Sequence, residues 1–407
     1  MHVRDPGRRF ARLVAQTCLA VAAVVTACSG AGDREDAGTP LTADFSGSGP
    51  GTLIDARTLP GIDAQLRGAT SLVARITYTS TSGVDDAHPR VTAAVFVPRG
   101  APPPGGWPIV AFGHPTTGIL HDCAPSRSPT LMGLSDTVTA LLGAGYVVTV
   151  SDYQGLGRDD TYHPYLDSTT VADNLIDSVF AARRLVPTTD RRWVAIGVEE
   201  GGQAAWAADE LVENAGQGLD LRGAVSVSPA ADIGGLADAA AAGRLTRDQK
   251  LALQAYLAAL KNEYPDFNLD DFRRGLVGDK WERLLACQGP AAQERTELAD
   301  QITADDLRPA GGAAVDTLRE YLAKTTLPQA RAAAPMLVMY GEGNQLIPAA
   351  WTDQAVDRAC AMGDMMNIQR QPVSAATDID MPTALAWIAA RLRGEGARND
   401  CPRFTAP

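Results

Sequence analysis

Residues Gly197-Val198-Glu199-Glu200-Gly201-Gly202 are the stretch that decides the fold. They follow a short apolar run at 194–196 and precede an alanine-rich run, starting at Gln203, that has the composition of a helix. A strand, a tight turn and a helix in this order are typical of the nucleophile elbow, Gly-x-Ser-x-Gly, which presents a serine at the end of the strand. Glu199 occupies the serine position. The stretch therefore predicts the scaffold of the elbow without its attacking hydroxyl group.

Around the elbow, strand-like and helix-like segments alternate along the chain. Segments expected to be strands are 71–80, 90–98, 108–112, 146–151, 194–196, 224–227, 336–340 and 366–369. Segments expected to be helices are 171–185, from 203 to about 212, and 382–392. Such alternation predicts an α/β fold with a mostly parallel central sheet and helices on both faces.

The pattern changes between residues 229 and 334. This interval reads as helices and polar loops, for example 247–261 and 316–324, with no convincing strand. Helices inserted at this point of an α/β sheet are typical of a cap or lid. We therefore expect a core formed by 52–228 and 335–407, with a helical cap at 229–334.

The N-terminus predicts export and lipid anchoring. An apolar stretch, 13–25, is too short to span a bilayer as a mature helix, and it ends in Val25-Thr26-Ala27-Cys28. Four basic residues precede it: Arg4, Arg8, Arg9 and Arg12. We expect 1–27 to be a lipoprotein signal peptide, Cys28 to carry the lipid that attaches the protein to the cell membrane, and 28–51 to be a flexible tether. An ordinary signal peptide that happens to contain Cys28 is the alternative.

Charge and cysteine content restrict the possible partners, disulfides and cofactors. The formal net charge of −12 argues against a nucleic-acid partner. Besides Cys18 and Cys28, the chain has four cysteines, which allow three pairings, and an oxidising compartment favours two disulfides over buried free thiols. The spacings do not fit a zinc site, so we expect neither a metal nor another cofactor. The four cysteines are Cys123, Cys287, Cys360 and Cys401.

Four stretches of the chain have a recognisable pattern: Gly113–Gly118 with Cys123–Ser126, Asp152–Gly157 with His163–Tyr165, Gly197–Gln203, and Trp387–Leu392 with Cys401. Together they resemble the secretory lipase family, α/β-hydrolases that cleave triacylglycerols and related esters. The resemblance covers residues 55–405 and implies an α/β-hydrolase fold with a helical cap. It also implies the disulfides Cys123–Cys287 and Cys360–Cys401, and an oxyanion-type turn at Pro115, Thr116 and Glu200.

The same resemblance allows each catalytic position to be compared. Such an enzyme needs a serine, an acid and a histidine, in that order along the chain. Glu199 stands at the nucleophile position and Asn344 at the acid position, and the histidine is absent near Ala376. No histidine follows His163. We expect His114, Asp152 and His163 to have structural rather than catalytic roles.

These departures predict a lipase-fold protein without the triad, which binds a lipid, an ester or an unidentified protein partner. An active lipase or carboxylesterase with atypical catalysis through Glu199 is the alternative, and an envelope component with a filled pocket is a third possibility. Because helix N-termini attract anions, we also expect the Glu199 carboxylate to accept hydrogen bonds from the elbow amides.

Overall fold

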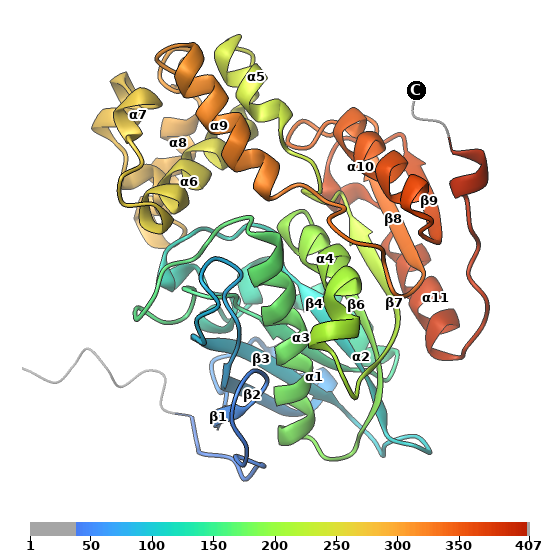
Figure 1. Cartoon of the computed structure of the whole chain (residues 1–407). Coiled ribbons are helices and arrows are strands. Elements are labelled where there is room, and N and C mark those ends of the chain that lie inside the picture. The colour runs from blue at the N-terminus through green and yellow to red at the C-terminus, as the bar shows by residue number, and fades with distance from the viewer. Residues whose placement is uncertain (1–37, 405–407) are drawn as a thin grey trace, which may run out of the picture. The chain divides into compact units, whose positions relative to one another are not determined.

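A nine-stranded sheet forms the centre of the computed structural model, which describes residues 38–404 (Figure 1). The strand order is β1-β2-β3-β5-β4-β6-β7-β8-β9. The strands β1 to β3 and β5 pair antiparallel, whereas the six strands from β5 to β9 are parallel to one another, so the expected mostly parallel sheet is confirmed. Their bounds are β1 Leu53–Thr58, β2 Thr70–Thr79, β3 Arg90–Pro98, β4 Trp107–Gly113, β5 Val147–Ser151, β6 Thr189–Val198, β7 Asp220–Val227, β8 Met336–Gly341 and β9 Met366–Gln371.

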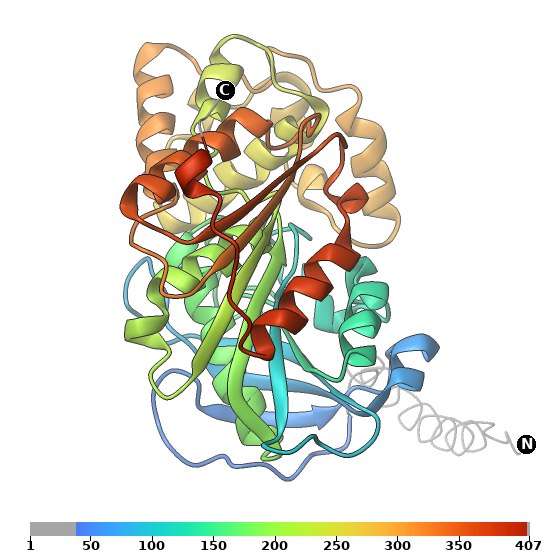
Figure 2. The same cartoon turned by 90° about the vertical axis from the view of Figure 1, so that its right-hand side faces the viewer.

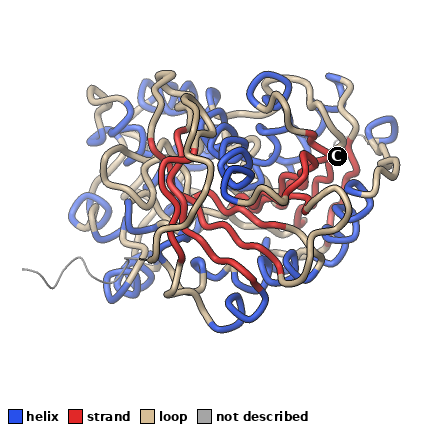
Figure 3. Tube along the Cα trace, turned by 90° about the horizontal axis from the view of Figure 1, so that it is seen from below, coloured by secondary structure: helices blue, strands red, loops and turns tan. Residues whose placement is uncertain are grey.

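Helices cover both faces of this sheet (Figure 3). Side chains alternate along β4: Ile109 and Ala111 pack with α3, α4 and α10, while Val110 and Phe112 pack with α1, α2 and α11. Because both faces are buried, the central strands are mostly apolar, and the polar residues of β5, Thr149 and Ser151, are buried as well. The covering helices are α1 Ala64–Ala69, α2 Ser135–Gly143, α3 Ser168–Leu185, α4 Glu200–Ala215, α10 Ala349–Met362 and α11 Met381–Leu392.

Five helices lie between β7 and β8, in the interval where the sequence predicts a cap. They have an apolar core of their own, which includes Tyr256, Phe272 and Leu318, and which continues into Tyr165 and Ile347 of the sheet-bearing part. Figures 1 and 2 show these helices grouped above the sheet. They are α5 Gly235–Ala241, α6 Arg247–Glu263, α7 Gly275–Asp279, α8 Gly289–Ala299 and α9 Gly312–Lys324.

The structure contains both disulfide bonds that the family resemblance implies. Cys123 and Cys287 are joined at 2.04 Å, and this bond connects the loop after β4 to the cap. Cys360 and Cys401 are joined at 2.00 Å, which ties α10 to the C-terminal segment.

The prediction of a flexible tether over 28–51 is wrong for residues 40–51, which make defined contacts with the folded core. Leu41 donates a backbone hydrogen bond to Ala56, Gly51 donates one to Thr79, and Asp44 pairs with Arg184 at 3.2 Å. Leu41 also packs against the apolar core. A composition rich in Gly, Ser and Asp lowers secondary-structure propensity, but it leaves the backbone amides free to pair with a neighbouring strand.

The signal peptide 1–27 and Cys28 lie outside the described residues. Within the described part of the chain, none of the helices is both long enough and apolar enough to cross a membrane.

Candidate functional site

The turn between β6 and α4 keeps the backbone conformation of a nucleophile elbow. Glu199, the single residue between the strand and the helix, has φ 54° and ψ −110°, a region that costs a non-glycine residue on the order of 1–3 kcal/mol. Its backbone holds the turn in place. The Glu199 amide donates to Val227, and its carbonyl accepts from Gln203 and Ala230. The strained conformation is therefore retained although the residue is not a serine.

Two glycines allow the elbow to form because the backbones around it approach each other closely. A Cβ atom on Gly197 would lie 1.9 Å from the carbonyl oxygen of Gly201. A Cβ atom on Gly201 would lie 2.0 Å from the carbonyl oxygen of Gly113 at the end of β4. The first and last glycines of the motif are thus required by packing of α4 against β4 and β6, independently of any chemistry at Glu199.

The Glu199 side chain does not cap the helix, so that expectation is wrong. The carboxylate accepts no hydrogen bond from the first turn of α4, and among the described residues it has no hydrogen-bond or ion-pair partner. It lines two adjoining cavities, of about 150 Å³ and about 20 Å³. Burial, together with the nearby charges of Asp248 and Glu200, raises its pKa to about 7.

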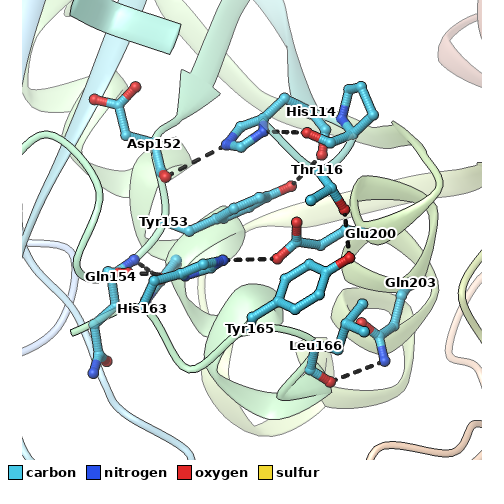
Figure 4. Close-up of polar contacts among 12 residues, drawn as sticks. His114, Thr116, Asp152, Tyr153, Gln154, His163, Tyr165, Leu166, Glu200 and Gln203 are labelled. Carbon is cyan, nitrogen blue, oxygen red and sulfur yellow. Dashed lines mark hydrogen bonds and ion pairs between the residues drawn. The ribbon is translucent and has the colours of Figure 1, made fainter. Parts of the chain in front are cut away.

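The next residue, Glu200, forms a buried pair with His163 (Figure 4). Its Oε1 atom lies 2.9 Å from Nε2 of His163, and Nδ1 of His163 lies 3.0 Å from the carbonyl oxygen of Gln154. Both side chains are almost completely buried. Because each ring nitrogen faces an oxygen acceptor, each contact needs a proton, and the imidazole has no free lone pair with which to take a proton from a nucleophile. We did not predict this pair, since the residues are 37 positions apart and no motif connects them.

His114 is also a structural residue, as the sequence analysis expects. Its ring stacks on Tyr153 with centroids 4.3 Å apart, and Nδ1 lies 2.7 Å from the carbonyl oxygen of Pro115. Burial lowers the pKa of His114, which favours the neutral ring. The Asp152 carboxylate is likewise occupied by structural hydrogen bonds. It accepts hydrogen bonds from the amide and hydroxyl groups of Ser126 and from the hydroxyl group of Thr92.

The three residues of the predicted oxyanion-type turn, Pro115, Thr116 and Glu200, differ in what they can donate. Pro115 has no N–H to donate, and its carbonyl instead lies against His114, so that assignment is wrong. The Thr116 hydroxyl lies 2.8 Å from the hydroxyl of Tyr165, and both side chains line the cavities beside Glu199. The Glu200 amide opens α4 and has no acceptor within that helix.

The remaining two triad positions lie on loops that follow β8 and β9. Asn344 is buried, and its Oδ1 atom accepts from the amides of Leu346 and Ile347 at 2.9 and 3.0 Å. Ala376 lies in a short 3₁₀ turn, Ala376–Asp378. Neither residue lines the two cavities beside Glu199, although Leu346 and Ile347 do. Asn344 therefore has a structural hydrogen-bonding role in the turn before α10.

One group of metal-ligand residue types comes together within the described residues. It consists of Asp122, Cys123 and Cys287. Both sulfur atoms are in the disulfide, so neither is available as a thiolate ligand.

The sheet order, the elbow between β6 and α4, and the helices inserted after β7 define an α/β-hydrolase fold. The family model for secretory lipases matches residues 130–400. This chain belongs to the secretory lipase family.

Known proteins of similar sequence or structure agree with this assignment. A curated relative from Mycobacterium tuberculosis (strain CDC 1551 / Oshkosh), named "Probable inactive lipase MT1628", is 26% identical over 392 residues, covering 88% of this chain and 82% of the relative. Candida antarctica lipase A in its closed state superposes with a TM-score of 0.72 at 14% identity, over 92% of this chain and 89% of that one. A ligand-bound form of the rice cell wall degrading esterase LipA from Xanthomonas oryzae gives 0.65 at 22% identity, over 88% and 99%. At these identities the two structures establish the fold alone.

Proposed function

We propose that this chain is an exported, lipid-anchored protein of the secretory lipase family that has lost the Ser-Asp-His triad and acts by binding. Its ligand is a lipid, an ester or a protein partner, recognised at the former active site beneath the cap. A fold can be retained after its chemistry is lost, so the function depends on the residues that face the ligand.

The observation that carries this proposal is Glu199 at the apex of a preserved elbow, where none of the histidines within residues 38–404 lines the cavities that it faces. His114 and His163, the buried histidines of this region, have their ring nitrogens facing carbonyl or carboxylate oxygens. A carboxylate could attack a carbon atom, but release of the resulting ester needs a base that activates water. The name of the mycobacterial relative, which calls that protein a probable inactive lipase, also favours loss of activity.

A second function has one observation in its favour. The unpaired Glu199 carboxyl with a pKa raised to about 7 is poised to change protonation state near neutral pH, as a catalytic acid or base does. An ester hydrolase acting through Glu199 is therefore the alternative to binding alone.

Hydrolysis of p-nitrophenyl esters of several chain lengths distinguishes the two functions. We expect soluble protein beginning at Ser29 to give no turnover above background, and Glu199→Gln to be indistinguishable from it, because a triad enzyme owes several powers of ten in rate to these residues. Turnover in the wild type that disappears in Glu199→Gln would instead establish catalysis by the carboxylate. Turnover that persists in Glu199→Gln would point to a contaminating esterase.

Anchoring through Cys28 is tested separately in cells. We expect the full-length protein to incorporate an alkyne-labelled palmitate analogue and to partition into the detergent phase of Triton X-114. Cys28→Ala is expected to lose the label completely, because the thiol is the acceptor of the lipid. Cys18→Ala, which changes a cysteine inside the predicted signal peptide, is the control and should be labelled normally. Equal labelling of Cys28→Ala and wild type would contradict the anchor.

A further inference from the structure

Residues 329–334, here called the strap, lie between α9, the last helix of the cap, and β8 of the sheet (Figure 1). Three carboxyl groups hold the backbone of the strap. Glu210 on α4 accepts hydrogen bonds from two amides at its start, at 2.9 and 3.0 Å. Asp364, in the turn between α10 and β9, accepts one at 3.0 Å, and Asp209 on α4 accepts one at 2.7 Å. The four amides are those of Gln329, Ala330, Ala332 and Ala334.

Each of these carboxyl groups also has an oxygen atom without a partner. The buried atoms Oδ2 of Asp209, Oε1 of Glu210 and Oδ2 of Asp364 accept no hydrogen bond from residues 38–404. The three residues are 0%, 7% and 2% exposed. A buried carboxylate with an unpaired oxygen is costly, whereas a proton on that oxygen removes the charge and leaves the other oxygen free to accept from the strap. The held strap therefore favours protonated carboxyl groups.

Burial and the mutual repulsion of the three groups favour the protonated forms as well. Burial, together with the nearby charge of Asp364, raises the pKa of Glu210 to about 7. Burial also raises the pKa values of Asp209 and Asp364, and the other two carboxyl groups raise that of Asp209 further. Hydrogen bonds from the strap oppose these shifts, as does the charge of Arg331 at Asp364. Arg358 on α10 is paired at 2.9 Å with a carboxylate outside this group.

We propose that the strap is a pH-dependent hinge of the cap, which is held while Asp209, Glu210 and Asp364 carry protons and is released when they lose them. Release lengthens the free connection between α9 and β8, so the cap becomes more mobile at this end. Elsewhere the Cys123–Cys287 bond continues to hold the cap to the loop after β4. This regulation goes beyond the proposed function and does not depend on which ligand the cavities beneath the cap bind.

The direction of the pH effect follows from proton binding in the two states. With the strap held, the pKa of Glu210 is about 7, whereas a released strap uncovers the carboxyl group and its pKa returns to the usual 4.5. Between these values the held state binds more protons than the released state, so raising the pH favours release. For Glu210 alone, the equilibrium constant for release rises about tenfold between pH 6 and pH 9. Asp209 and Asp364 add to this effect.

Hydrogen–deuterium exchange of the strap amides, measured on the full chain in detergent, tests the proposal. Protection factors at pH 6 and pH 9 are compared, because they divide out the intrinsic pH dependence of amide exchange. We expect protection of the strap to fall by about tenfold or more at pH 9. At both pH values it should also stay well below that of the β4 amides at 109–112, which shows that the strap opens without unfolding of the sheet.

Glu210→Gln removes one titrating group and keeps an oxygen atom for the strap amides. The change in strap protection between pH 6 and pH 9 should therefore be about tenfold smaller than in the wild type. Asp364→Asn is a second variant of the same kind, and its pH effect should also be smaller. Glu213→Gln, which removes an exposed carboxylate from α4, is the matched control and should behave like the wild type.

Three results would overturn the proposal. The first is strap protection that stays constant or rises between pH 6 and pH 9. The second is the wild-type pH dependence in both Glu210→Gln and Asp364→Asn. The third is equal protection of the strap and β4, which would mean that the strap opens only when the whole sheet unfolds. Neither ester hydrolysis nor ligand binding enters these measurements, so the hinge and the proposed function can each fail without the other.

Discussion

Gly201→Ala is expected to prevent the chain from reaching its native fold, with a loss of more than about 4 kcal/mol in the free energy of unfolding. The added methyl group would lie 2.0 Å from the carbonyl oxygen of Gly113, a backbone atom at the buried end of β4 that cannot move aside as a flexible side chain could. Relief would require α4 to move away from β4, which would open the centre of the sheet. Soluble yield, circular dichroism and urea denaturation measure the effect.

Gly68→Ala is the matched control for that experiment. Gly68 lies in α1, and a Cβ atom there would meet nothing within 4 Å. We expect this variant to be as stable as the wild type, or more stable by about 0.5–1 kcal/mol, because alanine favours the helix. A Gly201→Ala protein with the same denaturation midpoint as Gly68→Ala would show that the close contact between α4 and β4 is not present in solution.

The second large effect is a pH dependence of stability that arises from Asp177, a carboxyl group outside the elbow. Asp177 on α3 is buried, and its Oδ2 atom accepts a hydrogen bond from Ser80 at 2.7 Å. Burial raises the pKa of Asp177 to about 8. Between the unfolded pKa, near 3.8, and the folded value, the folded state binds more protons than the unfolded state. Stability should therefore fall as the pH rises from about 4 to about 8.

Asp177→Asn removes this titration and keeps an oxygen that can accept from Ser80. At pH 9 we expect the variant to be more stable than the wild type by about 2–4 kcal/mol, and at pH 5 nearly equal to it. Urea denaturation at the two pH values measures the difference. Asp173, on the same helix, has a pKa raised to about 7 by burial and by neighbouring carboxylates, so part of the pH dependence should remain in the variant. A variant that is less stable than the wild type at pH 9 would contradict a buried, protonated Asp177.

The strands of the sheet and the long helices that cover it could be predicted from the spacing of their apolar residues. That spacing reflects which faces of each element are buried. The run 108–112 is apolar on both faces, and the segment 171–185 repeats at helical spacing, so each indicates its own structure. The helix α10 was not predicted. Its buried face uses mainly small residues, Ala349, Ala355, Val356 and Ala359, and these give a weak periodic signal in the sequence. Residues 40–51 were misassigned for a related reason, since backbone pairing leaves no trace in composition.

At the site, the position of the elbow could be predicted from the sequence, but the contacts of its side chains could not. The glycine spacing around Glu199 identifies the turn because backbone packing demands those residues. The direction of the Glu199 carboxylate depends on which donors lie nearby in three dimensions, and it points toward the cavities rather than the helix amides. The Glu200–His163 pair depends in the same way on the approach of a distant loop. Such contacts are tertiary and carry no local pattern.

The Cys123–Cys287 bond has a consequence for how any ligand reaches the cavities beside Glu199. Gly118 and Ile119 precede Cys123 by a few residues, Leu284 and Leu285 precede Cys287, and all four line the larger cavity, of about 150 Å³. One covalent bond therefore holds together two parts of the cavity wall from distant regions of the sequence, which are 164 residues apart at the bond. In an oxidising compartment these parts cannot separate, so the cap cannot lift away there as a rigid flap. Any widening of the cavity therefore has to come from parts of its wall that this bond does not join.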